Sequence, residues 1–115
     1  MTIERINVGP RMSQAVIHGG AVYLAGQVAD EPSADVAGQT RQILAKIDRL
    51  LTEAGTDKSK LLSANVWLSD ISTFDQMNAV WDEWVTPGNP PARACVESRL
   101  ARPEFKVEIM VVAAR

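Results

Sequence analysis

The sequence predicts an α+β fold in which one mixed sheet carries two helices on one of its faces. Two segments show helical spacing of apolar residues, and several shorter segments show strand alternation. Their order along the chain is strand, strand, helix, strand, helix, strand, strand. So few helices among so many strands favour a single sheet with both helices packed on the same side.

The first two strands are predicted at residues 15–18 and 21–25, joined at Gly19-Gly20. Two glycines supply the positive φ angles that a tight hairpin turn needs. Residues 3–8 are expected to add an edge strand. Gly26 ends the second strand, and residues 30–34, which include Pro32, are predicted to form a loop.

A long helix follows. Either Ser33 or Asp35 can cap its start, and Gly55 suits the left-handed position after its end. Its apolar positions recur at helical spacing, namely Val36, Ile43, Leu44, Ile47, Leu50, Leu51 and Ala54.

The second half of the chain repeats this alternation of strand and helix. Residues 62–68 have strand periodicity, with Leu62, Ala64, Val66 and Leu68 on one face and Ser63, Asn65 and Trp67 on the other. Thr73 and Gln76 form a capping box for the second helix, which Pro87-Gly88 ends. The buried stripe of that helix contains Phe74, Met77, Asn78, Trp81, Trp84 and Val85. Two final strands are predicted at residues 92–98 and 106–113.

One sheet face is left without helices in this arrangement. The segment from strand 62–68 through the helix to strand 92–98 is long enough for a right-handed parallel crossover, which leaves the second face uncovered. That face carries Trp67, Met110 and Val112. A bare apolar face indicates self-association.

Size and composition narrow the functional classes. The 115 residues suit one domain, residues 1–115, with one core. The net charge of −2, without a basic stripe, argues against a nucleic-acid partner. The sequence shows neither a membrane-spanning run nor the start of a signal peptide, so a cytoplasmic location and no membrane partner are expected. One cysteine and one histidine, Cys95 and His18, make a zinc site within one subunit unexpected.

Arg93 and Glu108 are the leading candidates for function. If the last two strands form a hairpin that turns near Leu100-Ala101, Arg93 lies opposite Glu108 and points to the same side. Glu108 interrupts an apolar run, and a buried carboxylate needs a partner. One interpretation is a structural ion pair. The other is a guanidinium that grips a ligand carboxylate, with a glutamate that orients or deprotonates water.

Other candidates carry weaker signals. Asn78 lies within an otherwise apolar helix stripe, where its amide needs either a structural partner in a loop backbone or a ligand. Cys95 shares a strand face with Arg93 and Glu97, and is expected to behave as a small apolar residue. His18 is expected to be exposed and not catalytic. The three tryptophans suit a core or an interface.

The C-terminal motifs resemble a known family. Residues 91–97, Pro-Ala-Arg-Ala-Cys-Val-Glu, followed by residues 106–109, Lys-Val-Glu-Ile, look like the signature of the RidA (YjgF-type) reactive-intermediate deaminases. Residues 13–16, 23–27 and 77–81 fall in that family's order and spacing. The resemblance covers nearly the whole chain.

The resemblance implies a fold, an assembly and a reaction. The fold is a chorismate-mutase-like α+β subunit, and the assembly is a homotrimer whose sheets face a central core, with sites in clefts between subunits. The reaction is hydrolysis of 2-imino acids, such as 2-iminopropanoate or 2-iminobutanoate, or their enamine tautomers, to 2-oxo acids and ammonia. No metal and no cofactor is implied.

The resemblance also assigns residues. It makes Arg93 the group that binds the substrate carboxylate and Glu108 the group that positions the attacking water. Cys95, Asn78 and Gly26 match positions that line the cleft. Two positions depart from the family: Met12, preceded by an additional Arg11, replaces a tyrosine, and Ala25 replaces a serine. Both changes remove hydroxyl groups from the expected cleft and bear on the substrate range.

Two other functional classes remain open at this stage. One is a non-catalytic trimer that binds a small 2-oxo acid or related metabolite as a sensor or regulator, which the missing hydroxyls favour. The other is RNA binding or cleavage, which the acidic balance of the chain argues against.

Overall fold

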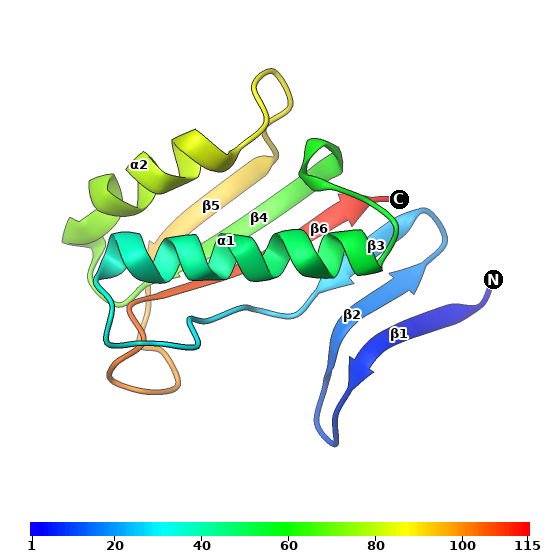
Figure 1. Ribbon diagram of the computed structural model, residues 1–115, viewed down its shortest axis with the longest axis horizontal. Coiled ribbons are helices and arrows are strands. Elements are labelled where there is room, and N and C mark those ends of the chain that lie inside the picture. The colour runs from blue at the N-terminus through cyan, green and yellow to red at the C-terminus, as the bar shows by residue number, and fades with distance from the viewer.

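The alternating segments form one six-stranded mixed sheet with two helices on one face, in a computed structural model that describes all 115 residues (Figure 1). Short 3-10 turns precede β4 and α2, at Lys58–Lys60 and Ile71–Thr73. The strands are β1 (Ile3–Val8), β2 (Ser13–His18), β3 (Ala21–Leu24), β4 (Leu61–Leu68), β5 (Ala92–Glu97) and β6 (Val107–Ala114), and the helices are α1 (Val36–Glu53) and α2 (Phe74–Trp84).

The strand order is β1-β2-β3-β6-β4-β5, and only β4 and β5 are parallel. The parallel pair flanking α2 is as predicted. The predicted hairpin of β5 with β6 is wrong, because β4 lies between them and pairs with both. Residues 98–106 are long enough to cross one strand, a span of about 10 Å between second neighbours. Two backbone hydrogen bonds hold the crossing on the two sides of β4: the Ser98 N–H donates to the Leu68 carbonyl, and the Ser69 N–H donates to the Lys106 carbonyl.

The core lies between the helices and the sheet. In β6, Val107, Ile109, Val111 and Ala113 are buried and alternate with half-exposed residues. Helix α1 covers this face with its fully buried Ile43, Leu44, Ile47 and Leu51. The cap of α1 is Asp35, whose side chain accepts from the Gly38 N–H, and Gly55 has the expected positive φ of 83°.

Three local predictions are wrong. Of the two glycines in the first turn, only Gly19 has a positive φ, of 59°, so the turn needs one left-handed residue and not two. Thr73 precedes α2, but its side chain makes no capping bond and instead donates to the Asp70 carbonyl at 2.6 Å, because a 3-10 turn leads into the helix. Leu62 is 52% exposed rather than in the core row, because the register with β6 shifts between Leu61 and Ser63.

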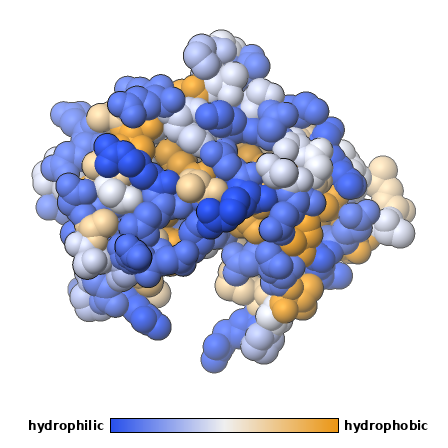
Figure 2. Space-filling view, viewed as in Figure 1, coloured by the Kyte–Doolittle hydropathy of each residue, from blue (hydrophilic) through white to orange (hydrophobic).

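The two faces of the molecule differ in character. The face that carries the helices is mostly hydrophilic (Figure 2). The opposite sheet face has no helix over it and presents Tyr23 and Val96, both about half exposed, with partly exposed Trp67, Met110 and Val112. The sequence-based prediction of a bare apolar sheet face is confirmed. Neither helix is long and apolar enough to cross a membrane.

Candidate functional site

Arg93 lies on the edge strand β5 and points under α2. It sits beside Ala64 in the parallel β4–β5 pairing, on the face that the helices cover. Its Nη1 donates to the Asn78 Oδ1 at 2.8 Å and approaches the Met77 Sδ at 3.8 Å. Its Cζ lies 5.0 Å from the centre of the Trp81 ring. The guanidinium is therefore fixed by one face of α2.

The cradle around Arg93 holds the cation without neutralising it. Its members are Phe74, Met77, Asn78 and Trp81, and the Phe74 ring centre lies 5.9 Å from the Arg93 Cζ. No carboxylate lies within ion-pair distance of the guanidinium. Aromatic faces attract a guanidinium and leave its outer N–H groups free. The half-buried cation can therefore accept an external anion.

The amide of Asn78 has a partner that the sequence did not indicate. Its stripe position suggested a loop backbone or a ligand. The structure instead pairs its side-chain oxygen with the Arg93 guanidinium, which comes from β5 and is 15 positions away in the chain. Asn78 therefore orients Arg93.

Glu108 lies on β6 and faces the bare side of the sheet. It is directly opposite Trp67 of β4, and no ion pair or hydrogen bond engages its carboxylate. Burial raises the pKa of Glu108 above the ordinary glutamate value. A half-buried carboxylate with a raised pKa and no fixed partner is suited to accept a proton from water.

Gly26 makes room for that carboxylate. A Cβ on Gly26 would overlap the Glu108 Oε2 and would lie 3.1 Å from its Cδ. The neighbouring Gln27 exchanges two backbone hydrogen bonds with Ile109, at 2.8 and 3.1 Å, which fixes this approach. The Gly26 N–H itself donates to no backbone carbonyl. A carboxylate and a free backbone donor thus lie side by side.

Arg93 and Glu108 lie on opposite faces of the sheet, and the predicted ion pair between them is absent. Insertion of β4 between their strands is the physical reason: Arg93 is in register with buried Ala64, whereas Glu108 is in register with Trp67 on the other face. Because neighbouring residues of a strand point to opposite faces, Ala64 and Trp67 separate the two groups. One subunit therefore carries two separate candidate half-sites, one around Arg93 and one around Glu108.

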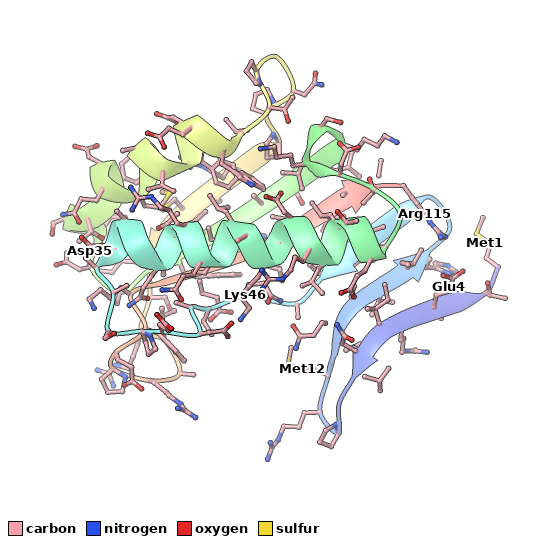
Figure 3. All side chains as sticks on the ribbon, in the orientation of Figure 1. Met1, Glu4, Met12, Asp35, Lys46 and Arg115 are labelled. Carbon is pink, nitrogen blue, oxygen red and sulfur yellow. The ribbon has the colours of Figure 1, made fainter.

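The remaining candidates divide between these half-sites. Cys95 shares the helix-covered face with Arg93 and packs partly against the core, and burial raises the pKa of its thiol despite the nearby Arg93 charge. Met12 is about half exposed and projects from the β1–β2 hairpin on the side of β2 away from β1 (Figure 3). His18 is exposed, as expected. The Ala25 N–H donates to the backbone carbonyl of Gln14 at 2.9 Å.

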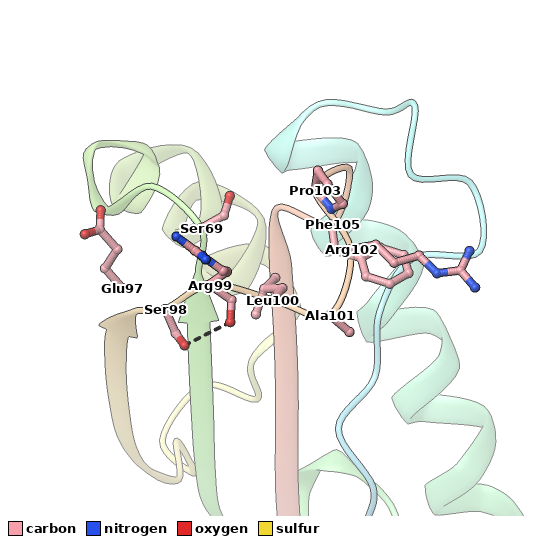
Figure 4. A pocket seen from close by; sticks show the side chains of 9 residues that line it. All are labelled: Ser69, Glu97, Ser98, Arg99, Leu100, Ala101, Arg102, Pro103 and Phe105. Atoms are coloured by element: carbon pink, nitrogen blue, oxygen red, sulfur yellow. Dashed lines mark hydrogen bonds between the residues drawn. The ribbon is translucent and has the colours of Figure 1, made fainter.

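The broadest hollow does not contain these residues. It measures about 780 Å³ and is formed by the segment between β5 and β6 together with Ser69 (Figure 4). Two of its polar side chains bond within the chain: the Ser98 hydroxyl donates to the Arg99 carbonyl, and Glu97 accepts from the Ile71 N–H. No three His, Cys, Asp or Glu side chains are grouped to hold a metal ion.

Comparison with known proteins places this geometry in a family. Residues 2–115 match the family model described as endoribonuclease L-PSP. A RutC family protein from Haemophilus ducreyi is 47% identical over 97% of this chain and 96% of its own length. The RutC family protein YoaB of Escherichia coli K12 is 43% identical over 99% of both chains. The chain belongs to the RidA/YjgF family.

Solved structures agree with this assignment. A YjgF family member from Neisseria meningitidis superposes with a TM-score of 0.98 at 46% identity, covering 100% of this chain and 96% of that one. A Rid family protein of unknown function from Yersinia pestis gives a TM-score of 0.86 at 31% identity, covering 94% and 90%. The RidA/YjgF fold expected from the C-terminal motifs is therefore confirmed.

Sequence reasoning overlooked three aromatic neighbours of the candidate residues of this RidA/YjgF protein. Phe74 and Trp81 were read as packing residues, yet both rings face Arg93. The available signal was their spacing with Asn78, which places all three on one helix face. Trp67 was read only as part of an interface, although it lies directly beside Glu108.

Proposed function

We propose that this RidA/YjgF protein hydrolyses short 2-imino acids to 2-oxo acids and ammonia, at sites that two copies of the chain complete together. The observation that carries the proposal is the pair of unpartnered half-sites: a cradled guanidinium without a carboxylate, and a carboxylate without a cation. A substrate with a carboxylate and an electrophilic carbon fits between them.

The assembly follows from the position of these groups. Arg93 is on edge strand β5, whereas Glu108 and Gly26 flank the bare apolar face of the sheet. A second copy seated on that face can bring its β5 edge towards the first copy's Glu108. We propose a homotrimer, because cyclic closure repeats this contact and buries every bare face around a central core.

The reaction requires few groups. Arg93 holds the substrate carboxylate with parallel N–H donors and so places the imine carbon. Water held by Glu108 attacks the carbon of the protonated imine and gives one proton to the Glu108 carboxylate, which leaves a neutral carbinolamine. Glu108 then passes that proton to the amino nitrogen. The C–N bond breaks as the carbinol O–H gives its proton to Glu108, which yields the 2-oxo acid and ammonia, and ammonia takes up that proton as ammonium. The free Gly26 N–H can donate to the developing oxygen.

The substrate range is set in part by two hydroxyl groups that the proposed cleft lacks. Met12 and Ala25 offer no hydroxyl where the family commonly has tyrosine and serine, so hydrogen bonding to the substrate depends on Arg93, Glu108 and the backbone at Gly26. The absence of these hydroxyls favours small 2-imino acids without polar substituents, such as 2-iminopropanoate and 2-iminobutanoate. The chain is proposed to need no metal or cofactor for this chemistry.

The test is an imine decay assay combined with subunit mixing. An amino-acid oxidase generates 2-iminopropanoate in situ, and semicarbazide capture reports the imine that remains. Arg93→Ala and Glu108→Ala are each expected to abolish the enhanced decay. When the two inactive variants are refolded together, about a quarter of the sites receive one intact residue of each kind, so about a quarter of wild-type activity should return.

The possible outcomes separate the proposal from its alternatives. Recovery on mixing supports a shared site, and full activity of Arg93→Ala shows that the role given to Arg93 is wrong. Binding of 2-oxobutanoate without faster imine decay by the wild type would instead establish a non-catalytic metabolite sensor, which the two missing hydroxyls favour. The net charge of −2 does not favour RNA as substrate, and a steep salt dependence of RNA affinity would contradict that view.

A further inference from the structure

A second polar pocket lies between α1 and the N-terminal strands and shares no lining residue with either half-site, although its Gln27 adjoins Gly26. It measures about 240 Å³, and of its seven lining residues only Leu50 is apolar. Four residues of α1 form one wall, and α1 lies on the sheet face opposite the bare one. Lys46 marks its position beneath the helix (Figure 3). Association through the bare face would therefore leave it accessible.

Two glutamine amides in the wall have orientations fixed by the backbone. Gln27 is only 4% exposed, and its Nε2 donates to the Ala25 carbonyl at 3.0 Å and to the Gln14 Oε1 at 2.9 Å. A carbonyl can only accept, so the Ala25 bond decides which end of the Gln27 amide is nitrogen. The Gln14 amide must then present its oxygen to Gln27 and turn its own nitrogen away.

This arrangement leaves one acceptor and one donor free. The Gln27 Oε1 receives no hydrogen bond from the protein, and the Gln14 Nε2 donates none. The protein contains no fully buried side-chain nitrogen or oxygen without a partner, so both atoms reach open space. Because both residues line the pocket, the free acceptor and the free donor are available to a ligand there.

The rim of the pocket carries a cationic and an anionic side chain that do not form an ion pair with each other. Arg49 and Glu53 lie one turn apart on α1 and form no ion pair. Lys46 is held elsewhere, by Asp30 and by the Val28 carbonyl, both at 2.9 Å. Asn7 adopts a left-handed φ of 53°, rare for a residue other than glycine, and its amide reaches the Glu53 Oε2 at 3.4 Å.

We propose that this pocket binds a small α-amino acid in its zwitterionic form. Arg49 and the Gln14 amide nitrogen receive the carboxylate, while Glu53 and the Gln27 amide oxygen receive the ammonium group. A cation and an anion that form no ion pair, together with one free amide donor and one free amide acceptor, match a zwitterion rather than a simple anion. The size of the pocket suits a short side chain. The assignment does not depend on the proposed deaminase function.

The experiment is calorimetric titration of the wild type with L-2-aminobutanoate, butanoate and 1-aminopropane at neutral pH and low salt. The amino acid is expected to bind at least about tenfold more tightly than either analogue, because each analogue lacks one charged group. Arg49→Gln and Glu53→Gln should each weaken binding at least about tenfold. Arg41→Gln, which removes another exposed arginine of α1 outside this pocket, should leave it unchanged.

Spectroscopy on the unaltered protein provides the second measurement. In two-dimensional NMR, L-2-aminobutanoate should shift the side-chain amide signals of Gln14 and Gln27. The proposal is overturned if no amino acid binds below about 10 mM, or if butanoate binds equally well. It is also overturned if Arg93→Ala abolishes binding, since the ligand would then occupy the Arg93 half-site.

Discussion

Gly26→Ala is a precise way to displace the Glu108 carboxylate without removing it. The new Cβ would overlap the Glu108 Oε2, so the carboxylate must move by roughly 1 Å to regain ordinary contact distance. The atoms that move are the far end of a flexible, half-exposed side chain. The stability of the protein should therefore change by less than about 1 kcal/mol.

Activity should fall far more than stability does. Misplacing a reacting group by about 1 Å can cost about 100-fold in rate, so we expect kcat/KM for 2-iminopropanoate to fall by about that factor. The imine decay assay measures the rate, and a thermal melt confirms folding. Gly20→Ala is the matched control, because nothing lies within 4 Å of a Cβ at that position. Wild-type activity in a folded Gly26→Ala variant would refute the assignment of Glu108 as the group that handles water.

Three further predictions concern the pH profile, the cradle and a buried amide. Burial raises the pKa of Glu108, so the enzymatic rate should fall with acidity through an apparent pKa above the ordinary glutamate value. Stability in urea unfolding should decline as pH rises through the same window, because the folded state holds the proton more tightly, and Glu108→Gln should remove this decline. Trp81→Leu should raise KM with little change in kcat, Trp81→Phe should recover much of the loss, and neither should have an effect when Arg93 is alanine. Gln39 is fully buried, the two hydrogens of its Nε2 lie among three carbonyl oxygens within bonding distance, and its Oε1 accepts the Lys106 N–H. Gln39→Leu should therefore cost at least about 3 kcal/mol in urea unfolding, whereas Gln42→Leu on the same helix should cost less than about 1 kcal/mol.

The buried glutamine in the last prediction also links two loops that are far apart in the sequence. The Gln39 Nε2 lies within bonding distance of the carbonyls of Pro32, Ala34 and Glu104, and its Oε1 accepts from the Lys106 N–H. It therefore joins the segment before α1 to the segment before β6. Its helical position in the sequence gave no indication of partners that lie up to 67 residues away.

Local patterns in the sequence determined the elements and the faces they bury. Alternation in residues 107–113 and helical spacing in residues 36–54 each depend on neighbours along the chain, so they identified β6 and α1 and the bare face opposite. The C-terminal motifs identified the family, because they preserve residue types at fixed spacing. The end of α1 was marked by Gly55 for the same local reason, and its start was narrowed to Ser33 or Asp35, of which the structure uses Asp35.

Only the tertiary structure decided how Arg93 and Glu108 are related. Strand order is a non-local property, and nothing in residues 92–108 shows that β4 enters between β5 and β6. That insertion puts the two groups on opposite faces of the sheet. As a result, Arg93 contacts the residues of α2, and Glu108 lies beside Gly26. Sequence alone could name the two residues, but their separation into half-sites follows from the pairing of strands that are distant along the chain.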